Sequence, residues 1–445
     1  MKIYMKTLGC DKNTVDSQSA AGLLLSKGHR LTGDAAGADV IMVNTCGFIQ
    51  DAKQESIDTI LALAAEKKAH QLLIVSGCLS QRYGEQLAKL IPEADFFLGV
   101  NDYSRLPDIL NGKSKGLRVF QSPCETLYEE IGCRITDGPV HTAPIKIAEG
   151  CNNVCSYCSI PSIRGCYRSR KAFEIIKEAE ALAEAGCREL VVVAQDVTAY
   201  GCDLPGEGHL IRLLEDLCRI EKISWIRLMY CYEDRITDAL IELIRREPKI
   251  CNYIDIPLQH SSDSILRKMN RHSTNSSIRK TITKLREQVP EIVLRTTLIV
   301  GFPGETKEDF AELMDFVDEM RFERLGVFAY SKEEGTPAAA LPRQVRRDVR
   351  ERRRDRIMAR QREISLESNR RMIGKTMDVL VDEPFDDGSF GGRTYRDAPE
   401  IDNGILFTSD RALKPGDIVP VLVTDAFDYD LTGVAQPEVT HESAQ

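Results

Sequence analysis

The stretch "EGCNNVCSYCSIPSIRG", residues 149–165, spaces Cys151, Cys155 and Cys158 as C-x3-C-x2-C and contains no fourth cysteine. A closed structural zinc site needs four ligands, usually supplied by two cysteine or histidine pairs. Thiolates are also the standard ligands of iron-sulfur clusters, and three of them leave one iron of a four-iron cluster open. The spacing therefore favours a cluster with an open iron, and a zinc site that borrows a distant ligand is the alternative.

The array follows the run "PIKIAE", which begins a series of six strand-like runs separated by helical patterns such as "AFEIIKEAEALAEAG". The later runs are "ELVVVAQ", "WIRLMYC", "YIDIPLQ", "LRTTLIVG" and "ERLGVFAYS". This alternation predicts a central partial (β/α)6 barrel over residues 137–370, an open relative of the closed eight-stranded barrel. Functional loops of such a barrel lie at the carboxyl ends of its strands, where the array is found.

Residues 1–122 predict an open parallel α/β domain, because the runs "KIYMKTLG", "DVIMVNT" and "LLIVSG" alternate with amphipathic helical patterns. Cys10, Cys46 and Cys78 each lie just beyond the carboxyl end of one of these runs. Those ends form a single edge of an open α/β sheet, where ligands bind. A buried thiol is the alternative for any one of them. Their shared position favours a second cluster with an open iron.

The end of the chain has a different texture. Residues 344–372 predict a highly charged helix, solvated and carrying i,i+4 ion pairs, with a basic RNA-binding face as the alternative. Short β-like runs and the turn signals "DDGSFGG" and "DNG" then predict a small all-β, OB-like barrel over residues 373–440. The remaining cysteines share no spacing and are interpreted as thiols outside the site: Cys124, Cys133, Cys166, Cys187, Cys202, Cys218, Cys231 and Cys251.

Composition is that of an ordinary soluble protein, with 42% hydrophobic residues. The start has no signal-peptide pattern and no window holds about 18 uninterrupted apolar residues, so we expect a cytoplasmic protein without membrane contact. The net charge of -9 is uneven, since residues 373–445 contain five Lys and Arg against 15 Asp and Glu. An acidic module repels RNA and attracts basic proteins, although acidity can also serve solubility alone.

The array "CNNVCSYC" resembles the signature of radical S-adenosylmethionine (SAM) enzymes, in which an aromatic residue, here Tyr157, precedes the last cysteine. The motifs "LGCDKNTVDSQ", "VNTCGFIQDAKQESI", "SGCLSQRY", "PLQHSSDSILRKMNR" and "TTLIVGFPGET" extend the resemblance along the chain to the methylthiotransferases. The match is closest to the branch that modifies an aspartate of small-subunit ribosomal protein twelve. It implies an N-terminal methylthiotransferase domain, a radical SAM barrel and a C-terminal TRAM barrel.

The resemblance implies two 4Fe-4S clusters and two uses of SAM. Cys151, Cys155 and Cys158 would hold the SAM cluster, and Cys10, Cys46 and Cys78 an auxiliary cluster that carries sulfur. SAM would supply the methyl group and also a 5′-deoxyadenosyl radical that attacks the β-carbon of the aspartate. No catalytic residue is expected beyond the cluster ligands.

The expected partner is a basic ribosomal protein of the small subunit, or the subunit itself. A reductant such as flavodoxin or ferredoxin is also expected, and RNA contact through the acidic barrel is not. A tRNA adenosine methylthiotransferase is the alternative enzyme. An iron-sulfur electron carrier and a binding adaptor are the alternatives without this catalysis.

Candidates for binding SAM are expected at strand ends: Gln195, Asp196, Arg295 and the "GFPGE" segment from Gly301 to Glu305. Glycine permits close backbone approach, and the polar side chains could hold the ribose or the methionine end. A simple turn is the alternative for "GFPGE", and His260 is interpreted as a polar barrel residue or an active one. One departure from the branch is "YCYEDR", residues 230–235, where an aromatic-proline pair is usual, so contacts around Tyr232 and Glu233 stay open.

Overall fold

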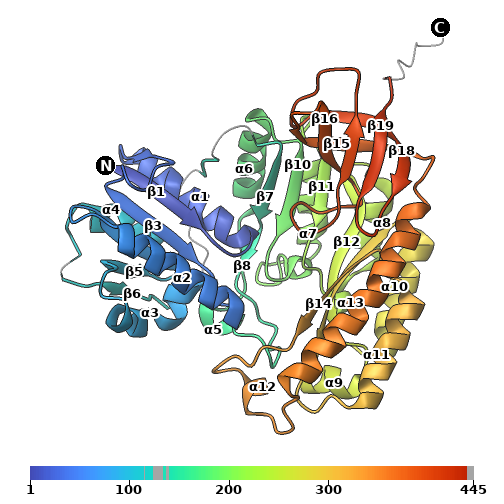
Figure 1. Ribbon diagram of the computed structural model, residues 1–445, viewed down its shortest axis with the longest axis horizontal. Coiled ribbons are helices and arrows are strands. Elements are labelled where there is room, and N and C mark those ends of the chain that lie inside the picture. Colours follow the sequence, from blue (N-terminus) through green and yellow to red (C-terminus); the bar gives the residue numbers. More distant parts are fainter. Residues whose placement is uncertain (115, 124–133, 137–139, 438–445) are drawn as a thin grey trace.

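A computed structural model describes residues 1–114, 116–123, 134–136 and 140–437. The described chain forms two six-stranded parallel sheets and a closed five-stranded barrel, which follow one another along the sequence (Figure 1). The predicted fold class is confirmed. Cys124, Cys133 and the predicted boundary positions 137 and 440 lie outside the described residues.

The N-terminal sheet has the strand order β2-β1-β3-β4-β5-β6, and every neighbouring pair is parallel. Its strands are β1 (Lys2–Thr7), β2 (Arg30–Leu31), β3 (Val40–Thr45), β4 (Leu72–Gly77), β5 (Phe96–Leu98) and β6 (Val119–Phe120). Its helices are α1 (Asp11–Ser26), α2 (Gln50–Glu66), α3 (Cys78–Leu90), η1 (Tyr103–Arg105) and α4 (Leu106–Leu110). All of β3 is buried, as expected for a parallel strand covered on both faces.

The central sheet has the order β14-β13-β12-β11-β10-β7, again entirely parallel. Its strands are β7 (Thr142–Lys146), β10 (Glu189–Val193), β11 (Trp225–Leu228), β12 (Ile250–Gln259), β13 (Val293–Val300) and β14 (Arg324–Ala329), beside the short antiparallel pair β8 (Ala148–Glu149) and β9 (Arg168–Ser169). The helices of this segment are α5 (Ile160–Arg164), α6 (Ala172–Glu184), η2 (Val197–Ala199), α7 (His209–Cys218), η3 (Glu233–Arg235), α8 (Asp238–Arg246), α9 (Asp263–Lys268), α10 (Asn275–Gln288), α11 (Lys307–Met320), α12 (Pro337–Ala340) and α13 (Arg347–Arg370). Each of the six predicted runs is a strand.

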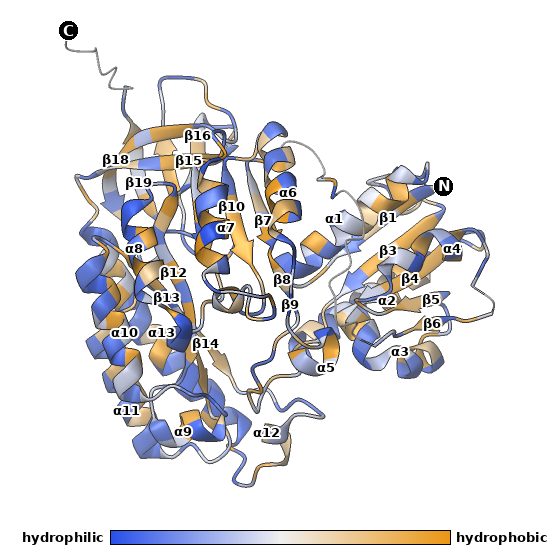
Figure 2. Ribbon diagram, turned by 180° about the vertical axis from the view of Figure 1, so that it is seen from behind, coloured by the Kyte–Doolittle hydropathy of each residue, from blue (hydrophilic) through white to orange (hydrophobic). Residues whose placement is uncertain are grey.

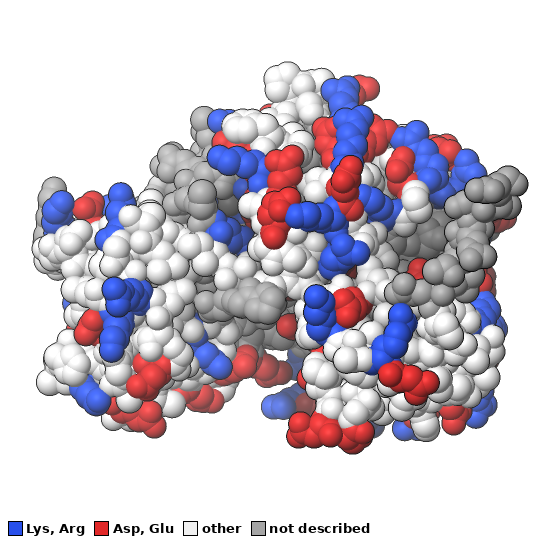
Figure 3. Space-filling view, turned by 90° about the horizontal axis from the view of Figure 1, so that it is seen from above, with Lys and Arg blue, Asp and Glu red and all other residues white. Residues whose placement is uncertain are grey.

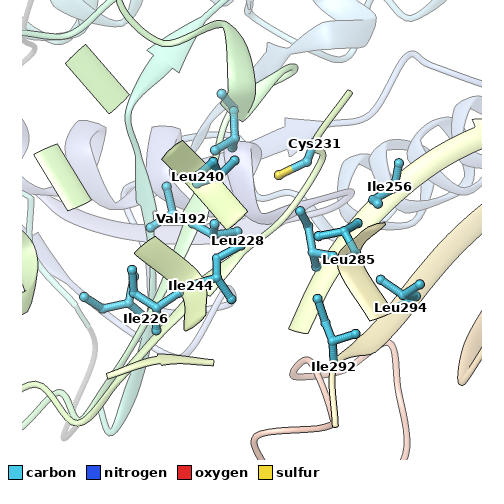
Figure 4. Close-up of a cluster of buried hydrophobic side chains, with 14 of the residues drawn as sticks. Val192, Ile226, Leu228, Cys231, Leu240, Ile244, Ile256, Leu285, Ile292 and Leu294 are labelled. Atoms are coloured by element: carbon cyan, nitrogen blue, oxygen red, sulfur yellow. The ribbon is translucent and has the colours of Figure 1, made fainter. Parts of the chain in front are cut away.

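Aliphatic side chains fill the space between the central sheet and its helices. Val192 of β10 and Leu228 of β11 belong to the same buried cluster as Leu240 and Ile244 of α8 (Figure 4). Cys231 lies in this cluster and is fully buried, so its thiol is part of the apolar core. Burial also raises the pKa of Cys231 well above its ordinary value, which keeps the thiol protonated.

Helix α13 is only half solvated, which corrects part of its prediction. The predicted i,i+4 ion pairs are present on its outer face, for example Arg347–Glu351 at 2.7 Å. Its other face is packed, because Ile357 and Ile364 are buried in the central core. Figure 2 shows the same division in this part of the molecule, with hydrophobic strands such as β10 covered by helices whose outward positions are largely hydrophilic. A charge-rich sequence conceals these few apolar contacts.

The C-terminal strands are β15 (Thr376–Pro384), β16 (Ser389–Thr394), β17 (Ile405–Thr408), β18 (Ile418–Ala426) and β19 (Leu431–Ala435). They close in the order β15-β16-β17-β19-β18 around an apolar core that includes Val379, Phe407 and Val421. Buried ion pairs hold this barrel on the central sheet. Glu189 of β10 accepts hydrogen bonds from Arg227 Nε at 2.7 Å and from Arg393 Nη1 at 2.6 Å.

Some acidic side chains of the barrel form ion pairs within the chain. Asp397 pairs with Arg324 of β14, and Asp402 pairs with Arg295 of β13 at 3.2 Å. Seen from the barrel end, basic and acidic side chains are interspersed rather than separated (Figure 3). Part of the negative charge of residues 373–445 therefore belongs to carboxylates that attach the barrel to the central sheet. Only the remaining carboxylates are available to a basic partner.

We expect Glu189→Gln to destabilise the protein by about 3–5 kcal/mol, because Arg227 would be left buried without a carboxylate. Urea denaturation followed by circular dichroism measures the change. The matched control is Glu242→Gln, which removes an exposed ion pair with Arg245 and should leave the urea midpoint nearly unchanged. Equal shifts of the two midpoints would contradict the assigned role of Glu189.

Candidate active site

Three neighbouring strands of the N-terminal sheet each lead to one cysteine. Strands β1, β3 and β4 are adjacent, and Cys10, Cys46 and Cys78 follow their carboxyl ends. Cys10 is the N-cap residue of α1, and Cys78 is the first residue of α3. The partial positive charge of a helix N-terminus stabilises thiolates and other anions. The structure thus places all three sulfur-bearing residues at one edge of the sheet.

Glycines beside these cysteines let the three loops touch. A Cβ atom added at Gly9 would lie 3.0 Å from Cys46 Cβ, and one added at Gly47 would lie 2.8 Å from the carbonyl carbon of Cys78. Real Cβ atoms essentially never show the second distance, and the first is tighter than nine in ten of their contacts. The backbone therefore brings the Cys10 and Cys78 loops against the Cys46 loop.

The donor chemistry of the N-terminal set fits an iron-sulfur cluster. Burial raises the pKa of Cys78 to about 11 and also raises that of Cys46, so iron binding must displace their protons. Among the residues that the structure describes, no three His, Cys, Asp or Glu side chains are arranged to hold one metal ion. Ligands of a four-iron cluster bind different irons and need not meet at one point, and thiols are their standard donors.

The cysteine array of the opening stretch lies at the carboxyl edge of the central sheet, after β7 and β8. Each sulfur is 3.4 Å from a polar group of the chain: the Asn153 N–H at Cys151, the Ile160 N–H at Cys158 and the Tyr232 hydroxyl at Cys155. Hydrogen bonds to the sulfurs are one means by which proteins set the potential of an iron-sulfur cluster. This second set also fits a cluster.

Tyr232, from the segment that departs from the expected branch pattern, therefore contacts the array directly. The Arg271 guanidinium lies 4.2 Å from its ring centroid and pairs with Glu233 at 2.6 Å. Arg271 was missed in the sequence, although it ends the motif "PLQHSSDSILRKMNR". Tyr157, within the array, packs against an apolar cluster that contains Phe302.

Gln195 and Asp196 follow β10, as expected, and contact the array loop and the residue two positions before it. Gln195 Nε2 donates to Glu149 Oε1 at 2.9 Å, while its buried Oε1 has no hydrogen-bond partner among the described residues. Asp196 is fully buried and accepts a 2.9 Å hydrogen bond from the side chain of Asn153, between two array cysteines. Asp196 therefore fixes the array loop, and Gln195 offers an unused acceptor.

The placement of Arg295 at a strand end is wrong. Arg295 is the third residue of β13, and its guanidinium binds Asp255 at 3.0 Å as well as Asp402 of the barrel. The predicted strand-like run "LRTTLIVG" already contains Arg295 as its second residue, so the sequence itself placed this side chain early in the strand. A role for Arg295 in SAM binding stays a prediction.

The "GFPGE" segment does follow β13 and is folded back by its own glutamate. Glu305 accepts hydrogen bonds from the N–H groups of Gly301 and Phe302 and pairs with Arg353 of α13 at 2.7 Å. Burial raises the pKa of Glu305 to about 7 despite this ion pair. His260 Nε2 lies 4.0 Å from the same carboxylate, and burial lowers the pKa of His260 to about 3.

Arg164 of α5 connects the two cysteine sets and was not singled out from the sequence. It is 1% exposed and donates to Cys78 Sγ at 3.4 Å and to Asn13 Oδ1 at 2.7 Å. The same guanidinium pairs with Asp16 at 3.0 Å and Glu149 at 2.9 Å. Its only sequence signal was its place in the opening stretch, six residues beyond Cys158.

Further ion pairs fasten the N-terminal sheet to the central one. Lys146 at the end of β7 binds Glu149 at 2.8 Å and also Asp16 of α1. At a second place, Glu333 after β14 binds Lys53 of α2 at 2.7 Å and Arg82 of α3 at 3.0 Å. The two sheet edges that present the cysteines are thus held together by charged contacts at two separate positions.

Comparisons with known proteins agree with this arrangement. The model of an uncharacterised protein family, UPF0004, matches residues 2–99, the radical SAM superfamily matches residues 145–317, and a TRAM domain matches residues 373–435. The ribosomal protein uS12 methylthiotransferase RimO of Geobacter sulfurreducens is 48% identical over 97% of this chain and 98% of its own. The enzyme of the same name from Clostridioides difficile is also 48% identical, with the same coverage.

The chain belongs to the family of ribosomal protein uS12 methylthiotransferases. Solved structures share the fold more distantly: the radical SAM methyltransferase TsrM of Kitasatospora setae has a TM-score of 0.57 at 14% identity over 76% of this chain and 73% of its own. The cobalamin-dependent radical SAM enzyme OxsB has a TM-score of 0.54 at 13% identity over 82% of this chain and 56% of its own. Membership of the uS12 methylthiotransferase family carries with it a radical SAM centre, which implies a 4Fe-4S cluster and SAM.

In the part of the chain that the structure describes, no helix is both long enough and apolar enough to cross a membrane.

We expect Gly77→Ala to disturb the N-terminal cysteine site. Gly77 has a φ of +96°, and an added Cβ would lie 2.2 Å from Asn44 Oδ1 and 2.6 Å from the Thr45 carbonyl oxygen. Gly28→Ala is the matched control, because Gly28 has a similar φ of +84° with nothing within 4 Å. The control should cost about 1–2 kcal/mol from backbone strain alone, and Gly77→Ala clearly more. Equal losses in thermal denaturation would refute the close packing at Gly77.

Proposed function

We propose that this protein transfers a methylthio group to the β-carbon of an aspartate in ribosomal protein uS12. The observation that carries the proposal is the pair of cysteine sets, held at two facing sheet edges and joined by the buried Arg164. Family membership supports the choice of substrate, because the uS12 methylthiotransferases match this chain along nearly their full length. A carbon without a leaving group requires radical chemistry, and the incoming sulfur requires a separate holding site.

The two cysteine sets would divide this work. Cys151, Cys155 and Cys158 would hold the SAM cluster, and Cys10, Cys46 and Cys78 would hold the auxiliary cluster. With SAM bound, these groups supply the radical, the methyl group and the sulfur.

The chain's own residues position these groups. Asp196 holds the array loop through Asn153, and the Tyr232 hydroxyl faces Cys155. Arg164 places a fixed positive charge beside Cys78. Helix N-termini at Cys10 and Cys78 add favourable dipoles for an anionic group.

SAM would bind over the carboxyl edge of the central sheet. The proposed contacts are Tyr157, Gln195, Asp196, Arg295, Gly301 and Glu305. Gln195 is the best supported, because its buried Oε1 has no protein partner among the described residues and sits beside the array. Glu305 would act mainly by shaping the glycine loop, since its carboxylate is already bound to that loop and to Arg353.

The proposed units are residues 1–122 for the auxiliary site, 137–370 for the radical SAM barrel and 373–440 for the TRAM-like barrel. Exposed carboxylates of the last unit, among them Asp378, Asp386 and Asp425, would face the basic ribosomal protein or the assembled subunit. They would also disfavour RNA contact through this barrel. A flavodoxin or ferredoxin would supply electrons.

The function is tested by the mass spectrum of uS12 from cells that lack this gene. We expect the methylthio group to be absent and to return with the wild-type gene. Cys46→Ala and Cys151→Ala should fail to restore it, whereas the control Cys202→Ala, at an exposed cysteine outside both sets, should succeed. A methylthiolated aspartate in the deletion strain would sink the proposal, and selective loss of a methylthio nucleoside from tRNA would assign the alternative activity.

The purified variants separate the two sites. Cys46→Ala should still form 5′-deoxyadenosine from SAM and reductant under anaerobic conditions, because its radical SAM array is intact. Cys151→Ala should form none. If Cys46→Ala lost SAM cleavage as completely as Cys151→Ala, the proposed division of labour would be wrong.

A further inference from the structure

Lys12 is a buried cation without a carboxylate partner. Its side chain is 8% exposed, and within the described residues no Asp or Glu oxygen forms a salt bridge with it. Its hydrogen-bond acceptor is the Ala194 carbonyl oxygen, at the long distance of 3.5 Å. The neighbouring buried cations Lys146 and Arg164 are both paired with carboxylates. Because burying an ammonium without an anion is costly, Lys12 invites a functional explanation.

The position of Lys12 joins the two cysteine sites. It lies in the first turn of α1, two residues after Cys10. Its ammonium reaches across to the central sheet, where Ala194 follows β10 and Tyr230 follows β11. Ala194 directly precedes Gln195, which contacts Glu149 at the start of the array. A ligand that must approach both cysteine sets would pass close to this ammonium.

Tyr230 holds the ammonium in a way that leaves it free to bind an anion. Lys12 Nζ lies 3.4 Å from the Tyr230 ring centroid, a cation–π contact that stabilises charge without neutralising it. Tyr230 itself has a φ of +56°, which is unfavourable for a residue with a Cβ. Its N–H is anchored by Asp255 Oδ2 at 3.0 Å. Such strained backbone is concentrated at functional sites, where the surroundings enforce it.

We propose that Lys12 binds a carboxylate in the active site, and that this carboxylate belongs to the target aspartate of uS12. The inference rests on the proposed function, which brings an aspartate side chain within reach of both cysteine sets. That carboxylate loses its water on entry and needs a counter-ion, and Lys12 is a desolvated cation at this place. The carboxylate of SAM has the same chemistry and is the other source that the experiment must distinguish.

The test measures binding by the full-length enzyme with both clusters reconstituted. One probe is a fluorescent uS12 peptide that contains the target aspartate, a second is the same peptide with asparagine at that position, and the third is SAM. We expect Lys12→Met to lower the affinity for the aspartate peptide at least about tenfold, as for loss of a buried charge pair. The affinity for the asparagine peptide should change less than about twofold. Lys12→Arg keeps the charge and should retain most of the preference for aspartate.

Lys249→Met is the control, because Lys249 is half-buried and, like Lys12, donates to a backbone carbonyl, but precedes β12 at the opposite edge of the sheet. It should leave all three affinities unchanged. Weaker SAM binding by Lys12→Met, with unchanged peptide binding, would support the carboxylate site and assign it to SAM instead. Equal losses for both peptides, or no loss for any probe, would overturn the proposal and leave Lys12 as a tether between the two sheets.

The outcomes also separate this inference from the proposed function. If the wild-type enzyme bound neither peptide, the assignment of uS12 as substrate would be at fault. SAM binding would then be the only measurement that tests the role of Lys12. Circular dichroism and the iron content of each variant establish that a lost affinity does not come from unfolding or from a missing cluster.

Discussion

The buried guanidinium of Arg164 is the contact on which the geometry of the protein depends. It comes from the helix that directly follows the cysteine array, yet its partners Asp16, Asn13 and Cys78 lie on helices α1 and α3 of the N-terminal segment. With Lys146 it balances the charges of Asp16 and Glu149 in a region where each of these groups is nearly inaccessible to water. Removing any one of these four side chains would leave a buried charge without its partner, which is strongly destabilising.

This constraint sets the relation between the two cysteine sets. Each set lies where parallel strands end, which is the ordinary place for a binding site in an α/β sheet. The unusual feature is that two such edges face each other and are fastened by ion pairs, at Arg164 and again at Glu333. A radical formed at one edge and sulfur carried at the other could then serve one substrate carbon without a large movement of either sheet.

The sequence was sufficient for what depends on local pattern. Continuous apolar runs predicted the six strands of the central sheet and three of the six strands of the N-terminal sheet, and the positions of Cys10, Cys46 and Cys78 after those three runs predicted a shared edge. These inferences succeed because strand burial and parallel connection leave a direct trace in residue order.

The sequence was insufficient for contacts between distant residues. Arg164 and Asp16 are 148 positions apart, and Lys12 and Ala194 are 182 apart, so neither pairing leaves a periodic signal. The contact of Arg295 with Asp402, 107 positions away, was equally hidden, and the buried side of α13 is masked by its many charges. The same charge excess overstated the free acidity of the barrel, because Asp397 and Asp402 pair with arginines of the central sheet.

The central claim is that both cysteine sets act on one carbon of one bound substrate. It is tested most directly with uS12 in which the β-carbon of the target aspartate carries deuterium. After turnover of the reconstituted enzyme, deuterium should appear in 5′-deoxyadenosine, and the same aspartate should carry the methylthio group. Methylthiolated protein formed together with unlabelled 5′-deoxyadenosine would contradict the account, because the radical would then have acted elsewhere.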